Sequence, residues 1–157
     1  MNIDRFTIKM KEALQGAENI ASRNNNAQID NEHMFLAILQ QQDGIAEPLL
    51  AKVGADFKGL LAEARTLVER LPKAYGGAVN IGVSSQLYQV LTNAQTEADN
   101  FKDEYVSTEH VVLALCGDDG AVGRLMKRFG ITRDALKQAL QSILVSQRAT
   151  DQDSESR

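Results

Sequence analysis

Apolar residues along the chain recur at the spacing of a buried helix face, and the same pattern occurs twice. In the first half the apolar positions are Met10, Ala13, Leu14, Ala17 and Ala21, and in the second half they are Leu87, Val90, Leu91, Ala94 and Ala98. The two sets differ by a constant offset of 77 residues. Spacings of three, four and seven residues are typical of amphipathic helices that bury one face. The pattern therefore predicts a matching helix in each half.

A second segment repeats at the same offset with stronger identity. Residues 29–39 (IDNEHMFLAIL) align with residues 106–116 (VSTEHVVLALC), and both contain Glu-His and Leu-Ala at the same places. After a one-residue deletion the match resumes at Leu49 and Leu125, Gly54 and Gly130, and Leu60 and Leu136. Since duplication explains three separate segments, the sequence predicts two tandem copies of one unit.

Each copy is interpreted as four helices, which gives an all-α fold. The expected helices cover residues 4–23, 31–41, 45–53, 57–70, 85–101, 108–117, 121–129 and 133–145. Asp30 and Ser107 stand where an N-cap accepts backbone N–H groups, while Gly54 and Gly130 are typical of helix C-termini. Asp56 and Thr132 are expected to cap the fourth helix of each copy.

The domain organisation follows from the repeat. We expect one domain over residues 1–146, with repeat one at 1–72, a linker at 73–83 and repeat two at 84–146. The copies are expected to be related by a pseudo-twofold axis. Residues 147–157 have no apolar stripe and are predicted to form a flexible tether.

Composition narrows the classes of function. Hydrophobic residues make up 43% and aromatic residues 5%, so the expected core is aliphatic. The net charge of −4 disfavours nucleic acid as a partner, and no apolar run is long enough to cross a membrane. The single cysteine, Cys116, is interpreted as a buried hydrophobe, and a reducing cytoplasmic location is expected.

Residues that could carry chemistry are few. The sequence has no phosphate-binding loop, no H-E-x-x-H and no C-x-x-C, so we expect no catalytic residue, metal or cofactor in this domain. His33 and His110 each follow a glutamate, which would suit a small hydrolase. The favoured interpretation is that both histidines pack or cap locally at a helix start, because a base needs a nucleophile or metal beside it.

Two surface features admit a binding role. An acidic cluster, offset mainly by Lys102, surrounds the junction of the fifth and sixth helices and comprises Glu97, Asp99, Asp103, Glu104 and Glu109. It is interpreted as a solvated junction that could also attract basic segments. Tyr75, Tyr88 and Tyr105 are interpreted as ordinary surface tyrosines, with recognition as the alternative.

The paired Glu-His segments, and DEYVSTEH at residues 103–110 in particular, resemble the duplicated N-terminal domain of the Clp/Hsp100 unfoldases. Within that group the chain is similar to the ClpB-type disaggregases through RLPK at residues 70–73 and RATDQDSE at residues 148–155. The resemblance implies a domain that contacts unfolded or aggregated polypeptide on a hexameric AAA+ ring. ATP and Mg²⁺ would belong to the parent motor, and the Hsp70 chaperone system would be a partner of the parent.

The resemblance also implies site residues. Positions associated with substrate handling map onto Thr7, expected in the first helix, and onto Asp103 and Glu109. Relatives bind hydrophobic segments in a groove lined partly by leucines, where this chain has Asn93, Glu97 and His110, so a more polar groove is expected. The alternative is docking of a folded adaptor, as in ClpA- and ClpC-type unfoldases. The isolated domain is expected to be a monomer.

Overall fold

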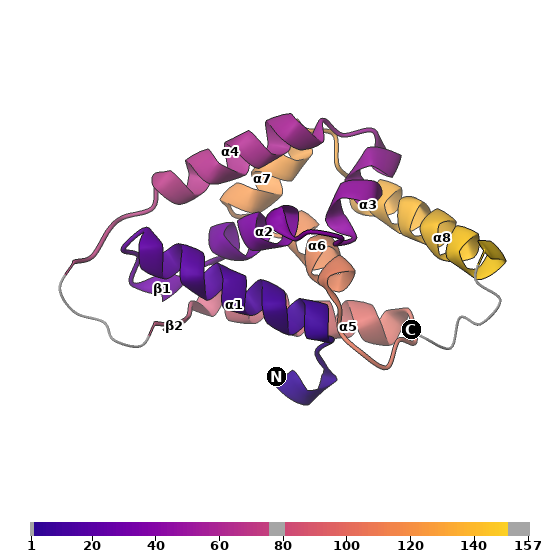
Figure 1. The fold of residues 1–157 in the computed structure, drawn as a ribbon, viewed down its shortest axis with the longest axis horizontal. Coiled ribbons are helices and arrows are strands. Elements are labelled where there is room, and N and C mark those ends of the chain that lie inside the picture. Colours follow the sequence, from indigo (N-terminus) through magenta and orange to yellow (C-terminus); the bar gives the residue numbers. More distant parts are fainter. Residues whose placement is uncertain (1, 76–80, 151–157) are drawn as a thin grey trace.

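The computed structural model describes residues 2–75 and 81–150, and in this part of the chain the fold is all-α (Figure 1). Repeat one supplies η1 (Ile3–Arg5), α1 (Ile8–Arg23), α2 (Asn31–Gln40), α3 (Ala46–Val53) and α4 (Phe57–Glu69). Repeat two supplies α5 (Ser85–Asn100), α6 (Thr108–Cys116), α7 (Ala121–Arg128) and α8 (Arg133–Thr150). All helices except α1 and α8 agree with the predicted bounds to within one residue at each end.

Helix α1 begins later than the sequence predicted. Residue 4 was expected inside the helix, but Phe6 is extended and Thr7 is the N-cap, with its Oγ1 accepting a hydrogen bond from the Met10 amide at 3.1 Å. The placement of Thr7 inside the first helix was therefore wrong. The cause is tertiary, because the backbone around Phe6 is paired with a distant segment of repeat two.

Helix α8 runs further than predicted. It continues to Thr150, so residues 147–150, which were assigned to the tether, are helical. No glycine or proline occurs between residues 131 and 150 to end the helix, unlike the first repeat, where Pro72 follows α4. The rest of the expected tether, residues 151–157, and residues 76–80 of the expected linker lie outside the described residues.

The predicted caps of the third and fourth helices are confirmed. Gly54 and Gly130 both adopt positive φ, at 92° and 74°, directly after α3 and in the turn that follows α7. Glycine enters this left-handed region without the steric cost that a Cβ imposes. Asp56 and Thr132 then accept hydrogen bonds from the amides of Gly59 and Ala135 at 3.1 Å each.

The two repeats exchange short extended segments, which the sequence analysis did not predict. Strand β1 (Gln28–Ile29) pairs in parallel with β2 (Gly82–Val83), and Phe6 forms a parallel bridge with Val106. Under the offset of 77, Phe6 corresponds to Val83 and Ile29 to Val106. The segment before the first helix of each repeat therefore pairs with the segment before the second helix of the other repeat.

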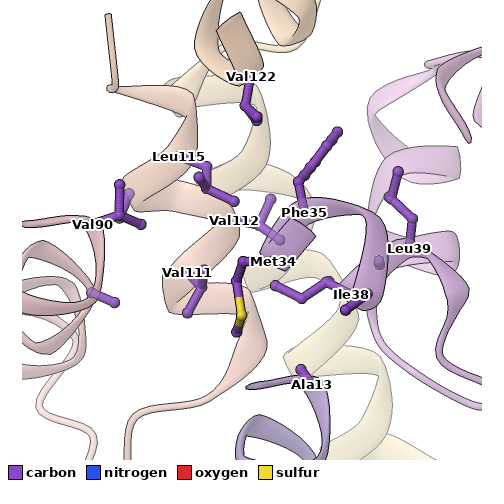
Figure 2. Packing of buried hydrophobic residues seen from close by; sticks show 14 of the residues in the cluster. Ala13, Met34, Phe35, Ile38, Leu39, Val90, Val111, Val112, Leu115 and Val122 are labelled. Carbon is purple, nitrogen blue, oxygen red and sulfur yellow. The ribbon is translucent and has the colours of Figure 1, made fainter. Parts of the chain in front are cut away.

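Helix packing follows the same exchange. Helix α3 of repeat one packs against α8 of repeat two, and α7 of repeat two packs against α4 of repeat one (Figure 1). At the centre, α2 and α6 meet near the pseudo-twofold axis, and Met34, Phe35 and Ile38 face Val111, Val112 and Leu115 (Figure 2). All six side chains are at most 1% exposed, so the repeats share one aliphatic core.

No described helix combines the length and the apolar character that a membrane-spanning segment requires.

Candidate functional site

Thr7, Asp103 and Glu109 all belong to the region where repeat one meets the entry into α6. The amide of Thr7 donates to the Val106 carbonyl at 3.0 Å, and the Val106 amide donates to the Arg5 carbonyl at 2.8 Å. Asp103 lies in the loop that leads to Val106, and Glu109 lies in the first turn of α6. The tertiary fold thus brings segments more than 90 positions apart in the sequence together at the Phe6–Val106 bridge, and this region is called one end of the repeat pair, the β1–β2 pair being the other.

Asp103 is bound by a buried histidine. The Nδ1 atom of His110 accepts the backbone amide of Ser107 at 2.9 Å, so in the neutral ring Nε2 carries the proton. That Nε2 group is 2.9 Å from the Asp103 Oδ2 atom and donates to it. The imidazole therefore bridges the start of α6 and the preceding loop, and it does so at 1% exposure.

The histidine of repeat one is arranged in the same way. His33 Nδ1 accepts the Asp30 amide at 2.8 Å, and its Nε2 lies 2.7 Å from the Asn26 Oδ1 atom. Burial lowers the pKa of His33, an effect that the nearby Asp30 carboxylate partly offsets. Both ring nitrogens of each histidine are thus engaged within the protein, which confirms the interpretation of the histidines as local caps.

The predicted site residue Glu109 and the single cysteine, Cys116, are both buried. Glu109 is only 8% exposed at the second position of α6, where the helix dipole favours a carboxylate. Cys116 is buried, its thiol lies 3.5 Å from the Ile131 carbonyl, and burial raises its pKa. The interpretation of Cys116 as a buried hydrophobe is confirmed.

The acidic cluster is neutralised differently from the prediction. Lys102 was expected to offset it, but Lys102 is exposed in a left-handed turn with φ of 59°, and no ion pair of the described residues includes it. Asp99 instead pairs with Arg5 at 2.9 Å, and Glu97 pairs with Arg133 at 2.6 Å. The hydrogen bonds that Arg133 donates to the Glu97 carboxylate raise the pKa of Arg133. Arg5 and Arg133 come from distant segments, so their role could not be read from local sequence.

Of the three residues expected to make a groove more polar, only Asn93 is exposed, and the groove itself stays a prediction. Asn93 is exposed and accepts a hydrogen bond from Gln89 at 3.1 Å. His110 was expected to add polar surface, and that expectation was wrong, because its ring is buried. Glu97 is 9% exposed and its carboxylate is held by Arg133.

An apolar groove that the sequence did not predict runs from η1 along α1 to the β1–β2 pair. A groove of about 280 Å³ is lined by both repeats, with apolar walls from Ile3, Phe6, Leu14, Ile29, Ile81 and Val83. Outside this lining, Ile8, which follows Thr7, is 76% exposed, and Tyr105, which precedes Val106, is 51% exposed. Tyr75 and Tyr88 are also exposed. The sequence has isoleucine at position 8 where the other repeat has Ser85. This difference could have pointed to an exposed apolar residue, but only the fold shows that position 8 lies at the surface.

Candidate metal ligands do not gather in the residues described. No group of three or more histidine, cysteine, aspartate or glutamate side chains is close enough there to hold an ion. The starts of α1 and α6 present hydrogen-bonding groups and the exposed apolar side chains of Ile8 and Tyr105.

Comparison with known proteins gives consistent matches. The sequence profile of the Clp repeat (R) N-terminal domain matches residues 5–129. The chain is 34% identical to the chaperone protein ClpB of Bacillus cereus over 158 aligned residues, covering 99% of this chain and 18% of that protein. It is 41% identical to the chaperone protein ClpB of Corynebacterium efficiens, covering 95% of this chain and 18% of that protein.

Solved structures give the same fold. The crystal structure of the Hsp104 N-terminal domain from Candida albicans superposes with a TM-score of 0.76 at 24% identity, covering 85% of this chain and 87% of that one. The chain spans less than a fifth of the length of the curated relatives it matches.

Proposed function

The chain belongs to the Clp repeat N-terminal domain family, and on that premise we propose that it is the polypeptide-binding N-terminal domain of a ClpB-type disaggregase. It corresponds to the N-terminal domain of the ClpB chaperones, which it matches over 18% of their length. Its own contribution is to bind unfolded or aggregated chains and release them to the parent motor. Contact with a client is made at the end of the molecule that carries Thr7, Asp103 and Glu109.

A single asymmetry supports this choice of end. Ile8 and Tyr105 are the sequence neighbours of Thr7 and Val106, whose backbones are hydrogen-bonded to each other. At the pseudo-equivalent end the corresponding residues are Ser85 and Gln28, which are polar. Unfolded polypeptides expose apolar side chains, and burial of apolar surface is the main favourable term in such contacts. The apolar end is therefore the better client surface.

A shallow surface suits the task. A client must be released to the motor, so moderate affinity serves transfer better than a deep pocket, and each tenfold in affinity is about 1.4 kcal/mol. The groove beside α1 is partly apolar and is bordered by Lys11, Gln15 and Glu18. This groove also reaches Ile29 and Val83 at the other end, so the difference between the two ends lies in the exposed side chains of Ile8 and Tyr105.

The same proposal includes the activity of the whole parent protein. The parent is an ATP- and Mg²⁺-dependent AAA+ hexamer in the cytoplasm that works with the Hsp70 chaperone system. This domain alone is a monomer. Its link to the ring keeps a bound client at high effective concentration near the pore.

The test compares the two ends of the molecule. The double variant Ile8→Ser, Tyr105→Gln gives the client end the residues of the other end. Binding of reduced, carboxymethylated α-lactalbumin, a permanently unfolded protein, should weaken about tenfold, because two exposed apolar side chains lose their contacts. Fluorescence anisotropy would measure the affinity. These exposed residues are better targets than Thr7 or Asp103, which also cap α1 or bind His110.

The matched control changes the other end. Ser85→Ala and Gln28→Ala alter exposed positions of the same kind and should leave the affinity unchanged. NMR chemical-shift mapping with the same unfolded protein should perturb Thr7, Ile8 and the residues around Tyr105. Equal weakening by both sets of variants, or shifts confined to the Gln28 end, would refute the proposed surface. A footprint seen only with a folded adaptor would favour the docking alternative.

A further inference from the structure

The two loops that join the first and second helices of each repeat are held in different ways. In repeat one the loop at residues 24–29 is bound by the end of its own repeat. Asn24 Nδ2 donates to the Val68 carbonyl at 2.8 Å, and Asn26 Nδ2 donates to the Pro72 carbonyl at 3.0 Å. Lys73 Nζ donates to the Asn24 carbonyl at 3.0 Å. Asn24 and Asn26 are therefore held by the chain that follows α4, whereas Gln28–Ile29 pair with β2.

In repeat two the corresponding loop, residues 101–106, is bound across the repeat boundary by Arg5. The Arg5 Nε donates to the Glu104 carbonyl at 3.2 Å, and one guanidinium nitrogen donates to the Asp103 carbonyl at 3.3 Å and to the Asp99 carboxylate at 2.9 Å. The backbone of Arg5 also accepts the Val106 amide at 2.8 Å. One residue thus contacts the loop with its side chain and its main chain.

The pseudo-twofold relation shows why this contact is particular to one end. The residue that corresponds to Arg5 is Gly82, which has no side chain, and Asp99 and Glu104 correspond to Ser22 and Ala27. In repeat two the residues that correspond to Val68, Pro72 and Lys73 are positions 144, 148 and 149, which lie in the extended helix α8. Within residues 133–150 no bent chain end holds the loop of repeat two as residues 68–73 hold the loop of repeat one, and Arg5 donates to the carbonyls of this loop instead.

We propose that Arg5 is the positioning residue of the client-binding end, because it fixes the loop of Asp103 against the segment that carries Thr7. The inference rests on the proposed function for its consequence in client binding, but the positioning itself is a property of the fold. An exposed ion pair with Asp99 alone would contribute little. The two carbonyl hydrogen bonds carry the effect, because they join the main chain of a turn in which Lys102 has positive φ to the segment of Thr7, and one of them is partly buried.

The test measures amide hydrogen exchange at the two ends. In Arg5→Gln, the amides of Thr7 and Val106 should exchange about tenfold faster or more. Local opening of this region then no longer requires the hydrogen bonds of the guanidinium group to break, so it costs less free energy. The amides of Ile29 and Ser84, which occupy the pseudo-equivalent places, should be unchanged. Arg5→Lys keeps the charge but loses the fork of donors, so it should resemble Arg5→Gln. Asp99→Asn should have a small effect.

Client binding then separates the two claims. Lys73→Gln is the matched control, because it removes a cation from the loop of repeat one and should change neither Val106 exchange nor binding of the unfolded protein. Faster exchange at Val106 with weaker binding supports both the positioning role and the proposed surface. Unchanged exchange at Val106 in Arg5→Gln overturns the positioning role. Faster exchange with unchanged binding overturns the proposed surface.

Discussion

The second helix of each repeat begins with the same histidine cap, but the residue that completes the cap differs. In repeat one the outer nitrogen of His33 meets Asn26, which is 7% exposed and neutral. In repeat two the outer nitrogen of His110 meets Asp103, whose carboxylate is 35% exposed. The inner half of the motif, a backbone amide donating to Nδ1, is nearly identical at 2.8 and 2.9 Å.

The difference shows which parts of a duplicated unit are free to diverge. A backbone amide at an N-cap needs a partner in both copies, so the histidine is retained. Its outer partner lies between the core and the surface, where a neutral amide and a partly solvated carboxylate both serve. Three matched pairs of substitutions, with one member of each pair in each repeat, and one single variant would break or sharpen this comparison.

The largest effect is expected in the shared core. Leu36→Asp and Leu113→Asp each place an unpaired charge at a side chain that is 4% and 1% exposed. We expect each to lower the free energy of unfolding by more than about 4 kcal/mol, because a buried carboxylate has no compensating partner. Thermal melts followed by circular dichroism would show loss of the cooperative transition. A wild-type melting temperature in either variant would contradict the assignment of a common core.

The histidine caps come next. His33→Ala and His110→Ala should each cost roughly 2–4 kcal/mol, because a buried backbone amide loses its acceptor and the ring leaves a cavity. His33→Ala should cost about 1 kcal/mol more, because Asn26 is buried whereas Asp103 can be solvated. Urea unfolding with both variants gives the difference. Equal losses would mean that the outer partner contributes little in either repeat.

A smaller and equal effect is expected at the helix ends. Gly54→Ala and Gly130→Ala should each cost about 1–2 kcal/mol, because alanine is strained at positive φ. No atom lies within 4 Å of the added Cβ at either glycine, so the cost is conformational in both repeats. Gly→Asn at the same positions should cost less and serves as the control. A clear inequality between the two alanine variants would show that the turns are not equivalent.

The smallest effect concerns pH. Because burial lowers the pKa of His33 in the folded state, the unfolded chain binds more protons below its ordinary value of about 6.5. Stability from this group is present above that pH and is lost as the pH falls below it. His33→Gln should flatten the pH dependence of the urea midpoint between about pH 6.5 and 5. Burial raises the pKa of Glu32, so this group changes the pH dependence of stability in the opposite direction. Glu32 is present in both the wild type and His33→Gln, so it does not affect the comparison.

Local interactions account for the parts of the fold that the sequence predicted. Helix α3, which ends at Gly54, and helix α4, which begins after the N-cap Asp56, were placed to within one residue. The misplaced ends, at Thr7 and Thr150, are those set by other segments or by the lack of a stop signal. The short strands were missed because each is only two residues long and forms only when the repeats meet.

The candidate site was less accessible to sequence reasoning. Thr7, Asp103 and Glu109 were assigned by resemblance, and their roles in client binding stay predictions. Neither Arg5 nor Ile8 could be identified from neighbouring residues. Arg5 matters because it binds carbonyl groups about 99 residues away, and Ile8 matters because its side chain is exposed. Neither property can be read from a helical pattern.

The sequence by itself determined the duplication, the helices and their caps, since these depend on contacts within a few residues and on the period of apolar positions. Only the tertiary structure decided that the repeats exchange extended segments, that α3 packs on α8 and α7 on α4, and that Arg5 binds the loop of Asp103. The physical reason is the distance along the sequence between the residues that interact. Caps and amphipathic faces are encoded locally, whereas the two ends of the molecule differ through pairs of residues that only folding brings together.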